Sequence, residues 1–213
     1  MLKIDFSFYK VSILVIWIFH LSGILGIYYG NSEWFISCTP LNLIISLVLL
    51  LLNSNDTNKI IMIACLSFII GMFTEILGVN YGIIFGSYNY GETLGPKLFG
   101  VPITIGYNWA MVLIITASIS QKFVENFYAR IFLGTSLMLF LDIMIEPVAP
   151  KLNFWTFDTG TAPFQNYIGW TFVSLPLHFI YQKLKIKKNN NFSIHLYFLQ
   201  IFFFALLLIK FGI

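Results

Sequence analysis

Long apolar stretches recur seven times along the chain, separated by short polar segments or by segments rich in glycine and aromatic residues. A transmembrane helix needs about 17–25 mostly apolar residues. No alternating ten-residue pattern recurs, so membrane-spanning strands are not expected. The predicted fold is therefore an all-α, polytopic membrane helix bundle in which residues 1–213 form a single integral membrane domain. Its seven predicted helices cover Val11–Tyr29, Phe35–Leu52, Ile60–Val79, Ile103–Ile119, Arg130–Val148, Tyr167–Leu184 and Phe192–Phe211.

The composition excludes a soluble protein and the distribution of charge predicts an orientation. Hydrophobic residues make up 58% of the chain and charged residues only 10%, against about 25% charged residues in soluble domains. The basic residues fall into two groups when the N-terminus is placed inside, with Lys3, Lys10, Lys59, Lys122, Arg130, Lys183, Lys185, Lys187 and Lys188 on the inner side and Lys97, Lys151 and Lys210 on the outer side. Because inner loops carry the excess of lysine and arginine, we expect a cytoplasmic N-terminus and an external C-terminus in the cytoplasmic membrane of a bacterium. No nucleic-acid partner is expected from a net charge of +3.

Two of the outer connections differ from ordinary loops. Residues Asn80–Pro102 combine glycines with aromatic residues, and Ala149–Asn166 contain four aromatic side chains. Structureless loops of such length are uncommon unless they have a function. We therefore expect both to pack against the bundle, the first as either a re-entrant segment or a surface cap.

Three acidic residues lie within predicted helices, near their outward ends: Glu75, Asp142 and Glu146. A charge in the hydrocarbon costs about 2.5–3.5 kcal/mol or more, so such residues usually face the interior and mark function. Asp142 and Glu146 share one helix face because they are four residues apart, and both are level with Glu75. No lysine or arginine is available at that depth, so at least one of the acids is expected to hold its proton at neutral pH and to serve as a proton donor. The plainer alternative is that they only bond to other helices or cap them, which Pro147 makes more plausible for Glu146.

Polar and aromatic residues are predicted at the same level as the acids. Asn108 needs hydrogen-bond partners, and Thr74, Ser87 and Thr104 are candidates. The other expected lining residues are Tyr88, Tyr90, Trp109, Trp155, Asn166 and Trp170. An ordinary aromatic belt at the membrane interface would account for each tryptophan and tyrosine taken singly.

Metal and nucleotide chemistry have no counterpart in the sequence. The three histidines, His20, His178 and His195, fall on different helices at different depths, and HExxH, CxxC and Walker motifs are absent. We therefore predict neither a metal nor another cofactor. Cys38 and Cys65 are predicted at opposite ends of the bundle and should not form a disulfide. Acids, aromatic rings and amides without a metal suit protonation of an apolar alkene, because aromatic faces stabilise the resulting carbocation and a held water can capture it.

The residues also resemble a known family. The segments Glu75–Asn80, Phe85–Tyr90 and Gly100–Trp109, followed by Asp142–Ala149, Trp155 and Tyr167–Trp170, are similar to motifs of the carotenoid biosynthesis protein family. That family includes hydratases that add water across the terminal 1,2 double bond of an acyclic carotenoid end. The resemblance implies a carotenoid substrate drawn from the bilayer, such as lycopene, γ-carotene or bisanhydrobacterioruberin, and a tertiary hydroxyl at carbon 1 of the product.

The residues and the resemblance lead to one set of expected roles. Asp142 or Glu75 would donate the proton, Glu146 or Asn108 would orient water, and the aromatic residues would surround the end of the polyene. Three other functions stay open from the sequence: a different membrane isoprenoid enzyme such as a cyclase, a proton-coupled transporter, and a non-catalytic scaffold. The sequence does not select the carotenoid, the oligomeric state or the single acid that donates the proton.

Overall fold

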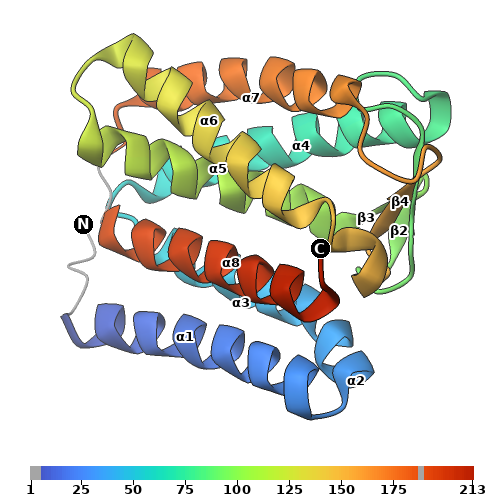
Figure 1. Cartoon of the computed structure of the whole chain (residues 1–213). Helices are drawn as coiled ribbons and strands as arrows, with labels where there is room; N and C mark the ends of the chain where they lie inside the picture. Colours follow the sequence, from blue (N-terminus) through green and yellow to red (C-terminus); the bar gives the residue numbers. More distant parts are fainter. Residues whose placement is uncertain (1–5, 187–189) are drawn as a thin grey trace.

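The computed structural model describes residues 6–186 and 190–213 as a bundle of long helices with a small cap at one end (Figure 1). The helices are α1 (Phe6–Tyr29), α2 (Ser32–Ser37), α3 (Thr39–Leu52), α4 (Thr57–Tyr81), α5 (Ile103–Phe123), α6 (Phe127–Ile145), α7 (Phe164–Leu184) and α8 (Asn190–Phe211). Six segments of the described chain are long and apolar enough to cross a membrane, with α2 and α3 counting together as one of them. α7 is as long as α5, but Gln165, Asn166, His178 and Gln182 make it less apolar. The predicted all-α, polytopic bundle is confirmed.

Helix α5 forms the centre of the bundle. Every residue from Trp109 to Ser120 is buried, because α3, α4, α6, α7 and α8 all pack against this helix. The surrounding helices instead expose large apolar side chains on their outer faces, such as Phe73, Phe132 and Phe172. A water-facing protein could not carry so many exposed apolar residues, whereas lipid accepts them.

Two helix boundaries differ from the prediction because of proline. The second predicted span, Phe35–Leu52, is divided at Cys38 into α2 and α3. Pro40 has no N–H to donate to the carbonyl of Ile36, and the hydroxyl of Thr39 donates to that carbonyl instead at 2.7 Å. The fifth predicted span, Arg130–Val148, is displaced by three residues from α6, which begins at Phe127 and ends at Ile145. The helix ends there since Pro147 cannot continue the helical hydrogen-bond pattern.

The described basic residues gather at the two ends of the bundle as predicted. The start of α1, the connections α3–α4 and α5–α6, the end of α7 and the start of α8 lie at one end, and the end of α8 and the cap lie at the other (Figure 1). Lys3, Lys187 and Lys188, which belong to the same pattern, lie outside the described residues. The assignment of these ends to the cytoplasm and the exterior stays a prediction.

The cap is formed by the two unusual connections, which pair with each other. β1 (Tyr88–Tyr90) runs antiparallel to β4 (Trp155–Phe157), and the partners are Tyr88 with Phe157 and Tyr90 with Trp155. A second pair, β2 (Lys97–Leu98) with β3 (Val101–Pro102), closes through Phe99 and Gly100, both with positive φ. The short 3₁₀ helix η1 (Ala149–Leu152) leads from α6 towards β4. Sequence patterns did not predict these strands, because each is only two or three residues long.

Candidate active site

The carboxyl group of Glu75 is buried near the C-terminal end of α4 and accepts three hydrogen bonds. The hydroxyls of Tyr88 and Tyr90 both donate to its Oε2, the second at 2.7 Å. The indole Nε1 of Trp109 donates to its Oε1 at 2.9 Å. Three donors compensate much of the cost of burying an ionised carboxylate.

The alternation of β1 explains why two tyrosines reach the same carboxyl group. Successive side chains of a strand point to opposite faces, so Tyr88 and Tyr90 point inwards and Asn89 is exposed. Burial raises the pKa of both tyrosines well above the usual range of a phenol, and the charge of Glu75 raises it further. Both hydroxyls therefore stay protonated and remain donors at every physiological pH.

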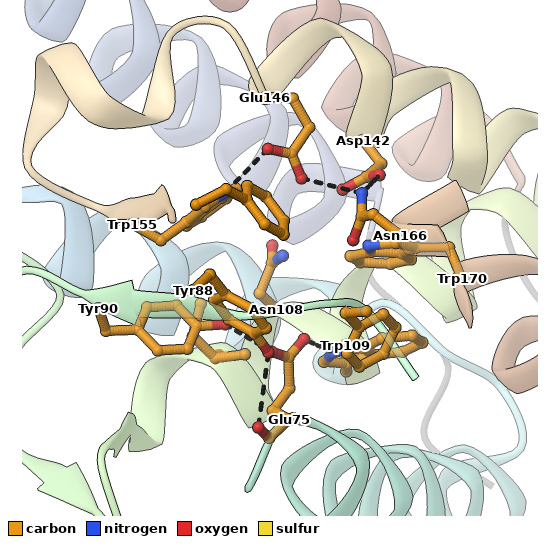
Figure 2. Close-up of a pocket in the computed structure, with 13 residues that line it drawn as sticks. Glu75, Tyr88, Tyr90, Asn108, Trp109, Asp142, Glu146, Trp155, Asn166 and Trp170 are labelled. Carbon is orange, nitrogen blue, oxygen red and sulfur yellow. Dashed lines mark hydrogen bonds between the residues drawn. The ribbon is translucent and has the colours of Figure 1, made fainter. Parts of the chain in front are cut away.

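Asp142 and Glu146 form a second acidic group across the site, on the last turn of α6 (Figure 2). The side-chain nitrogen of Asn166, on the first turn of α7, donates to Asp142 at 3.0 Å and to Glu146 at 3.1 Å. Glu146 also accepts a bond of 3.0 Å from the indole of Trp155. One amide nitrogen thus joins the two acids, and Asp142 accepts fewer protein donors than Glu75 or Glu146.

Aromatic rings form the walls between the two acidic groups. The indoles of Trp109 and Trp170 stack with ring centres 4.2 Å apart and planes 10° apart. Glycine permits close packing around the stack: a side chain at Gly71 would overlap Trp109, and one at Gly169 would overlap the backbone of Ile84 and the ring of Phe85, which contacts Trp170. The stack presents a continuous π surface beside the carboxylate of Glu75.

One small cavity brings the predicted residues together. It measures about 30 Å³, which accommodates one or two water molecules. All of the predicted site residues line it: Glu75, Tyr88, Tyr90, Asn108, Trp109, Asp142, Glu146, Trp155, Asn166 and Trp170. Phe85, Ile105 and Phe157 also line it and were not predicted. Ile105 is one helical turn before Asn108 and Trp109, and Phe157 alternates with Trp155, so helix and strand periodicity is the signal that could have identified them.

Asn108 differs from the other polar residues of this cavity in its hydrogen bonding. Among the described residues its side-chain amide has no hydrogen bond, and in Figure 2 it lies between the acid pair and Glu75. The suggestion that Thr74 and Thr104 bond to it is wrong, because Thr74 donates to the carbonyls of Ile70 and Gly71 and Thr104 donates to that of Leu94. Asn108 therefore remains able to bind a water or a substrate group.

Within residues 6–186 and 190–213 no cluster of histidine, cysteine or acidic residues has the arrangement of a metal site. His178 contacts Thr116 at 3.0 Å and the carbonyl of Ser174 at 2.9 Å, deep between α5, α6 and α7. The polar and aromatic side chains that line the cavity are acids, amides and rings, which are groups able to transfer protons and to stabilise charge.

Comparison with known proteins gives two similarities. The chain matches the family described as "Carotenoid biosynthesis protein" over residues 37–213. It is also 26% identical, over 107 residues, to a bisanhydrobacterioruberin hydratase of Haloarcula japonica. That alignment covers 45% of this chain and 36% of the archaeal protein, so the chain spans only about a third of that relative's length. No solved structure matches the chain.

Proposed function

Because the chain belongs to the carotenoid biosynthesis protein family, we propose that it is a membrane carotenoid hydratase. In this proposal it adds water across the terminal 1,2 double bond of an acyclic carotenoid end. The observation that supports it most is the single water-sized cavity in which the Asp142–Glu146 pair faces the carboxylate of Glu75. Similarity to a protein named a hydratase gives separate support for the reaction class.

Asp142 is the proton donor in this mechanism. Glu75 accepts three hydrogen bonds from side chains that stay protonated, and these favour its ionised form. Asp142 is buried, accepts a bond from Asn166 and lies beside Glu146. Two adjacent carboxyl groups resist double ionisation and share one proton. Asp142 gives this proton to carbon 2 of the alkene, and the electron pair of the double bond forms the new C–H bond.

Glu75 and the indole stack stabilise the cation that results. Protonation leaves a tertiary carbocation at carbon 1, which is attracted to the negative charge of Glu75 and to the π faces of Trp109 and Trp170. Charges that are fixed in place before the reaction act strongly in a site with little water. Glu75 thus stabilises the transition state through its negative charge and does not donate a proton.

Asn108 and Glu146 complete the addition. A water held by the free amide of Asn108 attacks carbon 1, and the ionised carboxyl group of Glu146 takes the proton that this water loses. Transfer of that proton from Glu146 to Asp142, which share the amide of Asn166, restores the starting state. The net reaction consumes one alkene and one water, with no net gain or loss of protons by the protein.

Expression of the chain in a host that accumulates lycopene tests the reaction. We expect pigments heavier than lycopene by one or two waters, with tertiary hydroxyl groups at carbon 1, when the extract is analysed by liquid chromatography and mass spectrometry. A product of unchanged mass with a new ring would instead identify a cyclase. Unaltered lycopene in cells that contain the folded protein would contradict a hydratase that accepts this substrate.

Replacement of Asn108 by leucine tests the water-holding role. Loss of the amide should slow hydration by about 10²-fold, as expected when a reacting group is misplaced, and the cation should lose a proton to give double-bond isomers of lycopene. The same pigment analysis measures both products. Ile105→Val is the matched control because Ile105 lines the cavity without a polar group. Equal hydrated yields from Asn108→Leu and the control would remove Asn108 from the mechanism.

A further inference from the structure

The small size of the cavity leaves most of a carotenoid without a binding place. About 30 Å³ holds a water molecule beside the reacting carbons, whereas the conjugated chain must lie elsewhere on the protein or in lipid. Any surface that holds this chain has to be apolar, elongated and adjacent to the cavity.

A groove between α3 and α4 has these properties. It has a volume of about 350 Å³, and its surface is apolar throughout. Its lining combines small side chains, Ala64, Cys65 and Ala110, with larger ones such as Leu47 and Ile61. The groove is open because α3 and α4 pack closely on α5 and have few contacts with each other.

The groove and the acidic cavity lie along the same stripe of α4. A helix returns to nearly the same face after seven, eleven and fourteen residues, so Phe68, Ala64 and Ile61 follow Glu75 along one line. Phe68, Ala64 and Ile61 all line the groove. At about 1.5 Å per residue, the line from Glu75 to Ile61 is about 21 Å long and runs towards the end of the bundle opposite the cap.

Two aromatic residues of the groove, Phe68 and Tyr107, pack against each other. The rings of Phe68 and Tyr107 pack with centres 5.3 Å apart, and both line the groove. Tyr107 immediately precedes Asn108, which lines the cavity. Residues of the groove and of the cavity are therefore adjacent on α5.

We propose that this α3–α4 groove binds the conjugated chain of the carotenoid while its end reacts beside Glu75 and Asp142. The inference rests on the proposed function, because it assigns the remainder of that same substrate. The apolar lining matches a hydrocarbon without polar groups, and the small side chains Ala64, Cys65 and Ala110 leave room for a polyene that carries methyl groups. Phe68 and Tyr107 separate the bound chain from the water of the cavity.

A second apolar hollow, of about 420 Å³, lies on α6 and α7 and is lined by Leu139, Tyr167, Thr171 and Phe172 among others. Its α7 residues begin at Phe164, the first residue of that helix, so it lies beside the cap. This hollow includes two hydroxyl-bearing residues, Tyr167 and Thr171, whereas the groove includes one, Tyr107, and the hollow does not continue the stripe of Glu75. It therefore fits a polyene less well than the α3–α4 groove, and the test includes it as the alternative binding site.

Bulky substitutions made in a chain that cannot catalyse hydration measure carotenoid binding separately from the reaction. In an Asp142→Asn chain, Cys65→Trp and Ile61→Trp each fill the α3–α4 groove, Thr171→Trp fills the α6–α7 hollow, and Met62→Trp is the control. Cys65, Ile61 and Met62 are all exposed on α4, so tryptophan at each should preserve the fold, which size-exclusion chromatography in detergent checks. The readout is lycopene retained per protein after purification from a lycopene-producing host.

We expect Cys65→Trp and Ile61→Trp to lower retained lycopene by about tenfold, equivalent to about 1.4 kcal/mol, and Met62→Trp to leave it unchanged. Three results would each contradict binding of the polyene in the groove: equal retention in all four variants, a loss confined to Thr171→Trp, or no retention by the parent Asp142→Asn chain. Hydration is measured separately with Asp142 restored. Retained lycopene without a hydrated product would refute the proposed reaction and leave the groove supported. Hydration that Cys65→Trp does not change would refute the groove and leave the proposed reaction supported.

Discussion

Substitution of Asp142 by asparagine is expected to leave a folded protein that forms no detectable hydrated carotenoid. The amide has nearly the shape of the acid and still faces Asn166, but it has no acidic proton to give to the alkene. General acids contribute about 10²–10⁴-fold to rates, so the loss of the proposed donor should lower hydration by at least that factor. Pigment analysis of the lycopene-producing host measures the product, and size-exclusion chromatography in detergent confirms the fold.

The conservative change Asp142→Glu is the control for this result. It keeps an acidic proton on the same face of α6, so it should retain part of the activity even though its longer side chain alters the distance to the substrate. Glu146→Gln should also lower the rate, because the captured water then lacks its base, while Asp142 still protonates the alkene and yields isomerised lycopene. Wild-type product from Asp142→Asn would end the proposed role of Asp142.

The sequence was sufficient to place the acids because an acidic side chain within an apolar helix must turn away from lipid and into the bundle. The spacing of Asp142 and Glu146 put them on one face of α6, and the depth of Glu75 put it at the same level. The cavity confirms that the three side chains meet. Six of the seven predicted spans were similarly accessible, since long apolar runs leave little choice of structure in a membrane, whereas α7 is a helix that is less apolar than the others.

The pairing partners could not be read from the sequence. Tyr88, Tyr90 and Trp155 were predicted near the acids, yet the β1–β4 ladder that positions them joins residues almost seventy positions apart in the chain. Strands of three residues give no periodic signal, so only the tertiary contact shows which acid each aromatic residue serves. For the same reason the sequence could not show that Asn166 bonds to both Asp142 and Glu146, or that Asn108 has no hydrogen-bond partner among the described residues.

This pairing is what separates the roles of the acids. From the sequence, Asp142 and Glu75 were equal candidates for the proton donor. The structure surrounds Glu75 with the donors Tyr88, Tyr90 and Trp109, and places Asp142 beside Glu146. A carboxylate that accepts three hydrogen bonds favours ionisation, whereas an acid beside another acid favours retention of a proton. The proposed division of roles between Glu75 and Asp142 therefore depends on contacts rather than on residue type.

Replacement of Glu75 by glutamine tests the proposed role of its negative charge in stabilising the carbocation. The glutamine oxygen can accept the bond from Trp109, whose indole N–H must donate, and its amino group can donate to Tyr88 and Tyr90, whose hydroxyls also accept. The shape of the site is thus kept while the negative charge is lost. We expect hydration to fall by about 10²–10³-fold, the usual cost of removing a preorganised group that stabilises transition-state charge.

Tyr88→Phe provides the matched comparison because it removes one hydrogen bond to Glu75 and leaves the charge. It should slow hydration far less than Glu75→Gln, and initial rates in lycopene-containing membranes measure both. If Glu75 were instead the proton donor, Glu75→Gln would abolish the isomerised products along with the hydrated ones, while Asp142→Asn would retain both. Equal, mild losses in Glu75→Gln and Tyr88→Phe would mean that the carboxylate only holds the cap in place, since the charge would then have no separate effect on the cation.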